Sequence, residues 1–162
     1  MNSQQKIHTT DQLINLVADW HHSNKSIVFT NGCFDLLHPG HVECLEKAKN
    51  LGDHLIVAVN SDLSVKRLKG ASRPITPEDS RARVIAGLQA VDAVVLFDQD
   101  TPEKLIQAIK PSVLVKGGDY QLSNIAGAEF VIQSGGKVVT IPLVSDYSSS
   151  AIINKLKKTQ NQ

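Results

Sequence analysis

Two histidines, His38 and His41, are separated by only Pro39 and Gly40 in the stretch TNGCFDLLHPGH, residues 30–41. Apolar β-forming residues precede this stretch and a helical pattern follows it, so we expect both imidazoles at a helix N-terminus. Such a terminus offers free N–H groups and about half a positive charge, which together attract anions. The imidazoles add donors for phosphate oxygens, the proline stiffens the approach, and the glycine lets a polyphosphate lie against the backbone.

Donors fixed in this way suit phosphoryl or nucleotidyl transfer. That chemistry requires a phosphorus held in line and stabilisation of the charge on its oxygens, without a covalent catalyst. Loss of one such donor commonly lowers a rate by on the order of 10²–10³. We therefore predict that His38 and His41 are catalytic and contact nucleotide phosphates.

Three other interpretations of the stretch are open. Asn31-Gly32 between β-formers resembles a hairpin turn, although the return strand would run at once into Pro39-Gly40. His38 and His41 could be two zinc ligands, but zinc takes three or four and neither cysteine stands at an obvious third position. Both histidines could also serve only in capping and packing.

The pattern around the stretch alternates strands with helices. Apolar runs predict strands at residues 26–30, 54–60, 93–97, 112–116 and 137–142. Helical spacing or capping residues predict helices that start after Thr9, span 42–51, start at Thr76 and Thr101, span 127–134 and start near Ser149. This order predicts a Rossmann-like α/β fold, a doubly wound sheet of five parallel strands with helices on both faces. Ligands bind such sheets beyond the carboxyl ends of the strands, where residues 30–41 fall.

The composition bounds the remaining possibilities. We expect one domain of 162 residues, with a helical extension at 1–25 and a catalytic core at 26–158. A formal net charge of +1 argues against a dedicated partner among nucleic acids or membrane surfaces. The N-terminus lacks the apolar core of a signal peptide, and Cys33 and Cys44 lack the CxxC spacing, so we expect reduced thiols and a cytoplasmic location.

HPGH, placed between the first predicted strand and its helix, resembles the HxGH signature of the nucleotidylyltransferase superfamily. YSSSAII, residues 147–153, resembles that superfamily's second signature, ISSTxIR, which opens a late helix. Ser150 stands at the threonine position and Ile153 at the arginine position. The triphosphate must therefore find its cation elsewhere, and the available cations are Lys66, Lys69, Arg73 and Arg81.

Five ordered blocks between about residues 27 and 156 resemble, more narrowly, the adenylyltransferases of bacterial ADP-heptose synthesis. They are FTNGCFDLLHPGHVECLEKAKNLGD, VNSDLSVKRLKGASRPI, VDAVVLFDQDTPEKLI, KPSVLVKGGDY and GAEFVIQSGGKVVTIPLV. The resemblance implies transfer of AMP from ATP to D-glycero-β-D-manno-heptose 1-phosphate, with Mg²⁺ held mainly through the nucleotide phosphates and not by protein side chains. It also implies a homodimer, and a stand-alone form of a domain that follows a sugar kinase in many relatives.

The expected site combines these signatures with the residues around them. The predicted catalytic residues are His38, His41 and Lys69. The predicted nucleotide-binding residues are Thr30, Asn31, Gly32, Cys33, Phe34, Gly40, Gly118, Asp119, Tyr147, Ser148, Ser149 and Ser150. The predicted substrate-binding residues are Asp35, Lys66, Arg73 and Arg81.

Two features of that site have alternatives. We expect Lys66 and Lys69 in a flexible cationic loop with Gly70 and Arg73 that binds the sugar phosphate or pyrophosphate; the alternative is a solvated basic loop. Asp35 could bind a substrate hydroxyl, orient the loop, or fill an Asx-type structural role.

Two other functions are open. The same chemistry could serve a cytidylyltransferase acting on glycerol 3-phosphate or a similar alcohol. A nucleotide-binding module without catalysis is the rival from another class.

Overall fold

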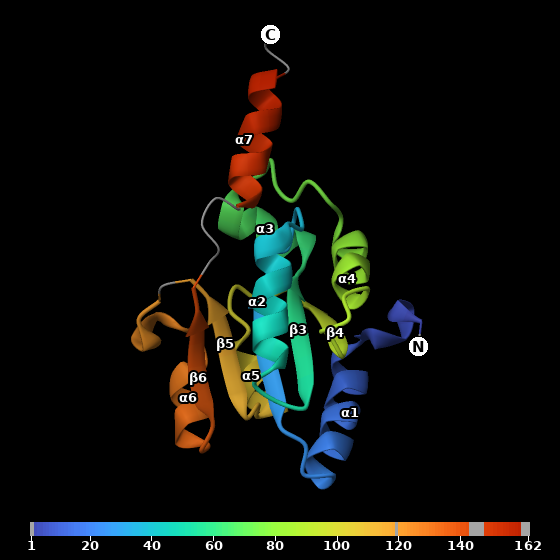
Figure 1. Cartoon of the computed structure of the whole chain (residues 1–162), viewed down its shortest axis with the longest axis vertical. Coiled ribbons are helices and arrows are strands. Elements are labelled where there is room, and N and C mark those ends of the chain that lie inside the picture. Colours follow the sequence, from blue (N-terminus) through green and yellow to red (C-terminus); the bar gives the residue numbers. More distant parts are fainter. Residues whose placement is uncertain (1, 119, 143–147, 160–162) are drawn as a thin grey trace.

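A single parallel sheet organises the molecule (Figure 1). The computed structural model describes residues 2–118, 120–142 and 148–159. Within them the strands are β1 (Ile7–His8), β2 (Ile27–Gly32), β3 (His54–Asn60), β4 (Ala93–Phe97), β5 (Val113–Gly117) and β6 (Lys137–Ile141). Their order is β1-β4-β3-β2-β5-β6 and all neighbours are parallel, so the predicted α/β fold class is confirmed.

The strand β1 is the one that the sequence pattern did not predict, and it gives the sheet six strands instead of five. It pairs with β4 through Ile7↔Val94 and His8↔Val95, and thus extends the edge of the sheet. A strand of two residues is too short to show an alternating pattern in the sequence. It forms because the folded chain brings these residues against β4.

The hairpin interpretation of Asn31-Gly32 is wrong. Both residues continue β2, where they pair in parallel with Ala58 and Val59 of β3. The chain then proceeds to the helix α2 (Pro39–Lys49), which starts three residues earlier than the predicted 42–51.

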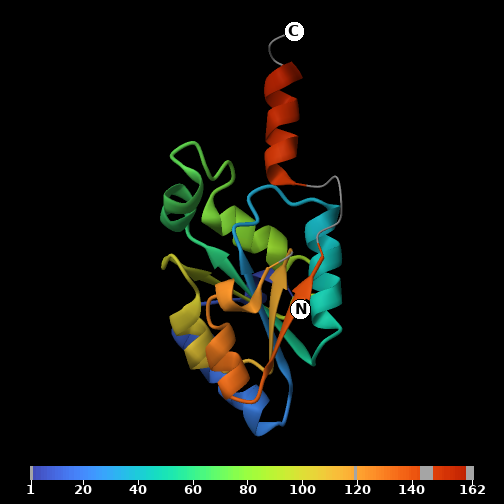
Figure 2. The ribbon, with the colours of Figure 1, turned by 90° about the vertical axis from the view of Figure 1, so that its left-hand side faces the viewer.

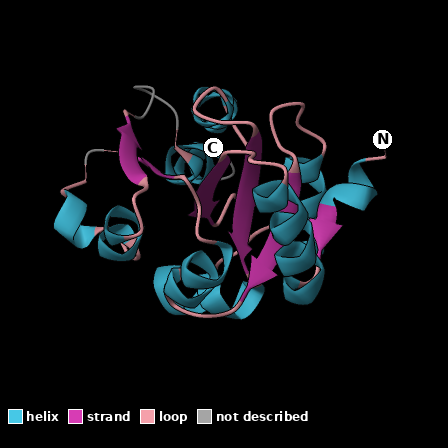
Figure 3. Ribbon diagram, turned by 90° about the horizontal axis from the view of Figure 1, so that it is seen from below, coloured by secondary structure: helices cyan, strands magenta, loops and turns pink. Residues whose placement is uncertain are grey.

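Alternate strand residues feed two separate cores. Phe29 and Ile56 face the helices α1 (Thr10–His22), α5 (Glu103–Ile109) and α6 (Ala128–Gln133). Val28 and Val57 face α2 and the helix α4 (Glu78–Ala86). Because both faces are covered, the strands are apolar on both sides, and Figure 3 shows helices above and below the sheet.

Two further helices lie toward the carboxyl ends of the strands. The helix α3 (Asp62–Lys69) contains Lys66 and Lys69, so the predicted loop is wrong for these two residues, whereas Gly70 and Arg73 follow the helix in a loop. Ser61 caps α3 by accepting the N–H of Ser64 at 3.1 Å. The helix α7 (Ser149–Thr159) projects beyond the body of the molecule (Figures 1 and 2). No helix in the described ranges is long and apolar enough to cross a membrane.

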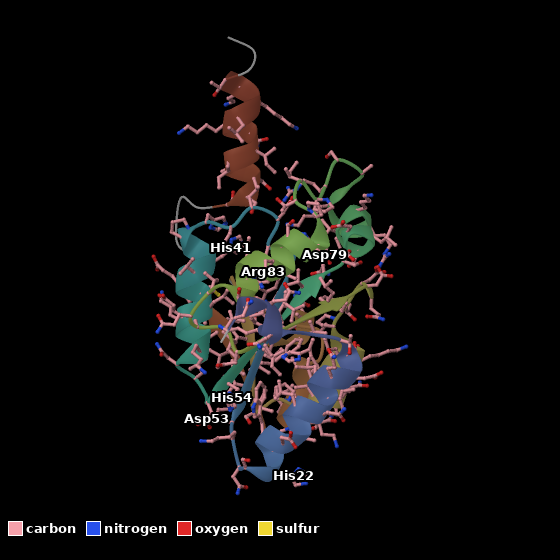
Figure 4. All side chains as sticks on the ribbon, turned by 90° about the vertical axis from the view of Figure 1, so that its right-hand side faces the viewer. His22, His41, Asp53, His54, Asp79 and Arg83 are labelled. Carbon is pink, nitrogen blue, oxygen red and sulfur yellow. The ribbon has the colours of Figure 1, made fainter. Side chains whose placement is uncertain are left out.

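The amino ends of the strands form the opposite pole. There the rings of Trp20 and His54 stack with centroids 4.0 Å apart. Figure 4 shows His54 in the lower part of the molecule and His41 well above it, nearer to α7. The histidine pair therefore lies at the carboxyl edge, as the sequence predicts.

Candidate active site

A cavity of about 280 Å³ opens at the carboxyl ends of β2 and β5, between the N-termini of α2 and α7; we call it the first cavity. Its lining brings together most of the predicted site residues. They are Thr30, Asn31, Gly32, Cys33, Phe34, Asp35, His38, Gly40, His41, Lys69, Ser148, Ser149 and Ser150. Cys44, Leu45, Lys116, Gly117 and Tyr120 complete it.

The two imidazoles lie against each other at the mouth of α2. Their ring centroids are 3.8 Å apart with an interplanar angle of 26°, and the ring of Phe34 meets His41 edge-on at 5.3 Å. Helical geometry explains this, because His38 is the N-cap of α2 and His41 is its third helical residue. The packing fixes both rings at the cavity wall.

His41 is held as a neutral donor. Burial, the adjacent His38 ring and the cation Lys69 lower its pKa to about 4. Its Nδ1 accepts the N–H of His38 at 3.4 Å, which leaves the proton of the neutral ring on Nε2. Burial also lowers the pKa of His38. Both rings therefore reach neutral pH able to donate one N–H each without carrying charge.

Two helix N-termini converge on this cavity. The first turn of α2 contributes Gly40, and the start of α7 contributes Ser149 and Ser150, with Ser148 directly before it. Ser148 Oγ accepts the N–H of Ala151 at 3.0 Å, and Ser149 Oγ donates to Leu36 O at 2.9 Å. The second bond fastens α7 to the turn after β2, so first-turn amides of both helices can meet one anion.

Of the four cations predicted to replace the missing arginine, only Lys69 belongs to the described lining of this cavity. Lys66 is exposed on α3 outside that lining. Lys116, which the sequence analysis did not select, does line the cavity. The one available signal was its place at the end of a predicted strand, directly before Gly117 and Gly118.

Asp35, in the lining of the first cavity, is paired with Arg73, which lies outside that lining. The buried carboxylate of Asp35 accepts Nε of Arg73 and the N–H groups of Ile75 and Thr76, the latter two on Oδ1 at 2.8 and 2.9 Å. Burial raises the pKa of Asp35, but these donors outweigh that effect and the pKa falls below its usual value. Asp35 thus fastens the segment after α3 to the turn that bears the histidines.

Arg81 is fully buried and joins three elements. It donates from Nε to Thr76 O at 2.9 Å, from Nη1 to Cys33 O at 2.6 Å and from Nη2 to Asp62 Oδ1 at 2.8 Å. Every guanidinium nitrogen is thereby engaged by protein. We assign Arg81 a positioning role for the turn after β2 and for α3.

A second cavity, of about 440 Å³, adjoins the first. It reaches from the end of β3 at Asn60 to the start of α5. The two cavities share six lining residues, which we call the shared wall: Asn31, Gly32, Cys33, Lys69, Lys116 and Tyr120. Two ligands could therefore meet at this wall.

Three predicted nucleotide-binding residues remain. Gly118 is buried just behind the lining, and its N–H donates to Ile141 O at 2.8 Å. Asp119 and Tyr147 lie outside the described residues.

Donors and cations dominate the groups that face the cavity. Among the described residues, no cluster of three His, Cys, Asp or Glu side chains could hold a metal ion. The zinc interpretation thus finds no third ligand in that part of the chain. Imidazole, ammonium, hydroxyl and amide groups instead suit phosphate oxygens.

Comparisons with known proteins show which proteins the chain is similar to. Residues 29–155 match the family model described as cytidylyltransferase-like. The bifunctional protein HldE of Koribacter versatilis (strain Ellin345) is 54% identical over 153 residues, which are 94% of this chain and 32% of that protein. The HldE protein of Pseudomonas fluorescens (strain SBW25) is 51% identical over 158 residues, 98% of this chain and 33% of that one. The chain spans about a third of the length of these curated relatives.

The chain is also similar to solved structures. The lipopolysaccharide core biosynthesis protein from Thermoplasma volcanium GSS1 is 32% identical with a TM-score of 0.59, and the match covers 76% of this chain and 99% of that one. The pantoate-beta-alanine ligase from Francisella tularensis is 17% identical with a TM-score of 0.60, and the match covers 96% and 79% of the two chains. The second likeness supports the fold alone.

Proposed function

Because the chain belongs to the cytidylyltransferase-like family and is a nucleotidyltransferase, we propose that it transfers AMP from ATP to D-glycero-β-D-manno-heptose 1-phosphate. The products are ADP-heptose and pyrophosphate. The observation that carries this proposal is the pair of neutral imidazoles at a cavity where two helix N-termini meet. The five sequence blocks that resemble the ADP-heptose adenylyltransferases support the choice of substrates.

The chemistry follows from the donors. The phosphate oxygen of the sugar is already anionic at neutral pH, so no general base has to create the nucleophile. His38, His41 and the first amides of α2 bind phosphate oxygens of ATP and stabilise the charge that builds up on them during displacement. The serines of α7 bind the nucleotide from the other side of the first cavity, and Lys69 neutralises the charge of the pyrophosphate that leaves.

We propose Mg²⁺ as the companion of ATP, bound mainly through the nucleotide's own oxygens, because Asp35, the one carboxylate in the described lining, is already engaged by Arg73 and two backbone N–H groups. When bound, the ion neutralises phosphate charge and polarises the reacting phosphorus. The cytoplasmic location and the homodimer remain predictions, and sedimentation analysis measures the second.

The test is a substrate panel on the purified chain. ATP with the heptose 1-phosphate should release pyrophosphate and give a product with the mass of ADP-heptose. CTP, GTP and UTP, and glycerol 3-phosphate as acceptor, form the comparison. Pyrophosphate only from CTP with glycerol 3-phosphate would replace the proposal by a cytidylyltransferase. ATP binding in calorimetry without pyrophosphate from any acceptor would favour a non-catalytic module.

A further inference from the structure

Two lysines stand on the shared wall between the cavities. Lys69 reaches it from the last turn of α3, and Lys116 reaches it from β5. A transfer between a ligand in each cavity has to occur across this wall. The two ammonium groups therefore flank the place where two phosphates would approach each other.

Neither of these lysines is neutralised by the described part of the protein. No ion pair joins Lys69 or Lys116 to a described carboxylate, whereas the buried cations Arg73 and Arg81 are paired with Asp35 and Asp62. The fold thus supplies counter-charges to the cations that hold the scaffold. It leaves the two on the shared wall available to a ligand.

Lys116 is the more constrained of the pair. It is half-buried, its Nζ lies 5.4 Å from the centroid of the Tyr120 ring, and the ring face is a favourable partner for a cation. Burial lowers its pKa, with the Cys33 thiol acting in the opposite direction. A partly desolvated ammonium that forms no ion pair with a described carboxylate is stabilised when an anion binds, which marks Lys116 as a ligand-binding group.

We propose that Lys116 binds the phosphate of the acceptor and thereby selects phosphomonoester acceptors over uncharged alcohols. This inference rests on the proposed function and adds the residue that recognises the phosphate of the acceptor. An acceptor phosphate oxygen forms the new bond to the α-phosphorus of ATP, and the bond from that phosphorus to the bridging oxygen breaks. Pyrophosphate leaves with the electron pair, and no proton is transferred in that step. Lys116 and Lys69 offset the repulsion between the two anions.

The test compares Lys116→Gln and Lys116→Arg with Lys137→Gln, an exposed lysine at the first residue of β6. At saturating ATP, Lys116→Gln should lower kcat/KM for the heptose 1-phosphate by on the order of 10². The KM for ATP should change less than about threefold, Lys116→Arg should recover part of the loss, and Lys137→Gln should behave as wild type. The melting temperature of Lys116→Gln should change little, because the substitution removes no ion pair with a described residue and only a contact with the exposed Tyr120 ring. Unchanged acceptor kcat/KM, or an equal loss for ATP, would overturn the proposal.

A binding experiment separates this inference from the proposed function. With the first cavity saturated by a non-hydrolysable ATP analogue, inorganic phosphate should raise the melting temperature of the wild type and of Lys137→Gln. The rise should be several-fold smaller for Lys116→Gln. If the wild type releases no pyrophosphate with the heptose phosphate but this difference holds, the choice of substrate fails and Lys116 remains a phosphate ligand. If phosphate raises the melting temperatures of Lys116→Gln and Lys137→Gln equally, the proposed role of Lys116 is wrong.

Discussion

The stacked rings of His38 and His41 restrict the charge that the pair can carry. Two imidazolium groups with centroids 3.8 Å apart would repel each other, and the nearby Lys69 adds to that repulsion. Both rings therefore stay neutral, and each can donate a hydrogen bond but adds no positive charge to the cavity. The positive field comes from the helix termini and the lysines.

Replacement of His41 by Ala should lower kcat for pyrophosphate release by about 10²–10³, with a smaller change in the KM for ATP, since the donor acts most strongly on the charge that develops during displacement. Steady-state kinetics measure this. His22→Ala is the matched control, because His22 is exposed at the opposite pole (Figure 4). Near-normal turnover of His41→Ala would contradict the catalytic role.

The charge state of His41 can be observed directly. Its pKa of about 4 lies below the ordinary 6.5, so in the ligand-free protein the ring should stay neutral from about pH 8 down to about pH 5. The proton should reside on Nε2. Nitrogen-15 NMR of the imidazole distinguishes both tautomer and charge. A titration centred near 6.5 would show that the ring is more solvated than the fold implies.

At the scale of elements, five of the six described strands and most helices could be predicted because each carries a continuous apolar run or a regular apolar stripe. The helix α3 could not. Two of its apolar side chains, Leu63 and Leu68, are exposed, and only Val65 packs inward with Ser64. Its stability comes from the Ser61 cap and from contacts distant in sequence, which no local pattern records.

Arg81 provides one of those contacts, through Asp62 at the start of α3. Arg81→Met should reduce the free energy of unfolding by about 3 kcal/mol, because it leaves Asp62 and two backbone carbonyls without their donor. Urea denaturation measures the loss. Arg83→Met, two residues along the same helix, is the control and should lie within about 0.5 kcal/mol of wild type, since Arg83 is exposed. Equal free energies of unfolding for Arg81→Met and Arg83→Met would contradict the positioning role of Arg81.

At the scale of the whole molecule, the fold assembles the first cavity from segments that lie far apart in the chain. The bond from Ser149 to Leu36 spans 113 residues, and Lys116 meets Lys69 on the shared wall from different elements. His38 and His41 could be predicted because one short motif holds both. Lys116 could not, since a lysine at the end of a strand has no local signal of function.

Acid should weaken the molecule as a whole. Burial lowers the pKa values of His8, His38, His41 and His54 below those of the unfolded chain. Below about pH 6.5 the unfolded state therefore binds more protons than the folded state, so the free energy of unfolding falls as the pH falls. Urea titrations followed by circular dichroism at about pH 7.5 and about pH 5.5 should show the loss. A constant free energy across that interval would mean that these rings are protonated equally in both states.

The stack of Trp20 on His54 gives this chain an internal optical reporter. Trp20 is the only tryptophan in the sequence, and it stacks on His54 at the pole away from His38 and His41. Its fluorescence should follow denaturation yet stay nearly constant when a nucleotide binds. The fluorescence should also be quenched in acid, because the protonated imidazole of His54 in contact with the indole of Trp20 quenches its excited state.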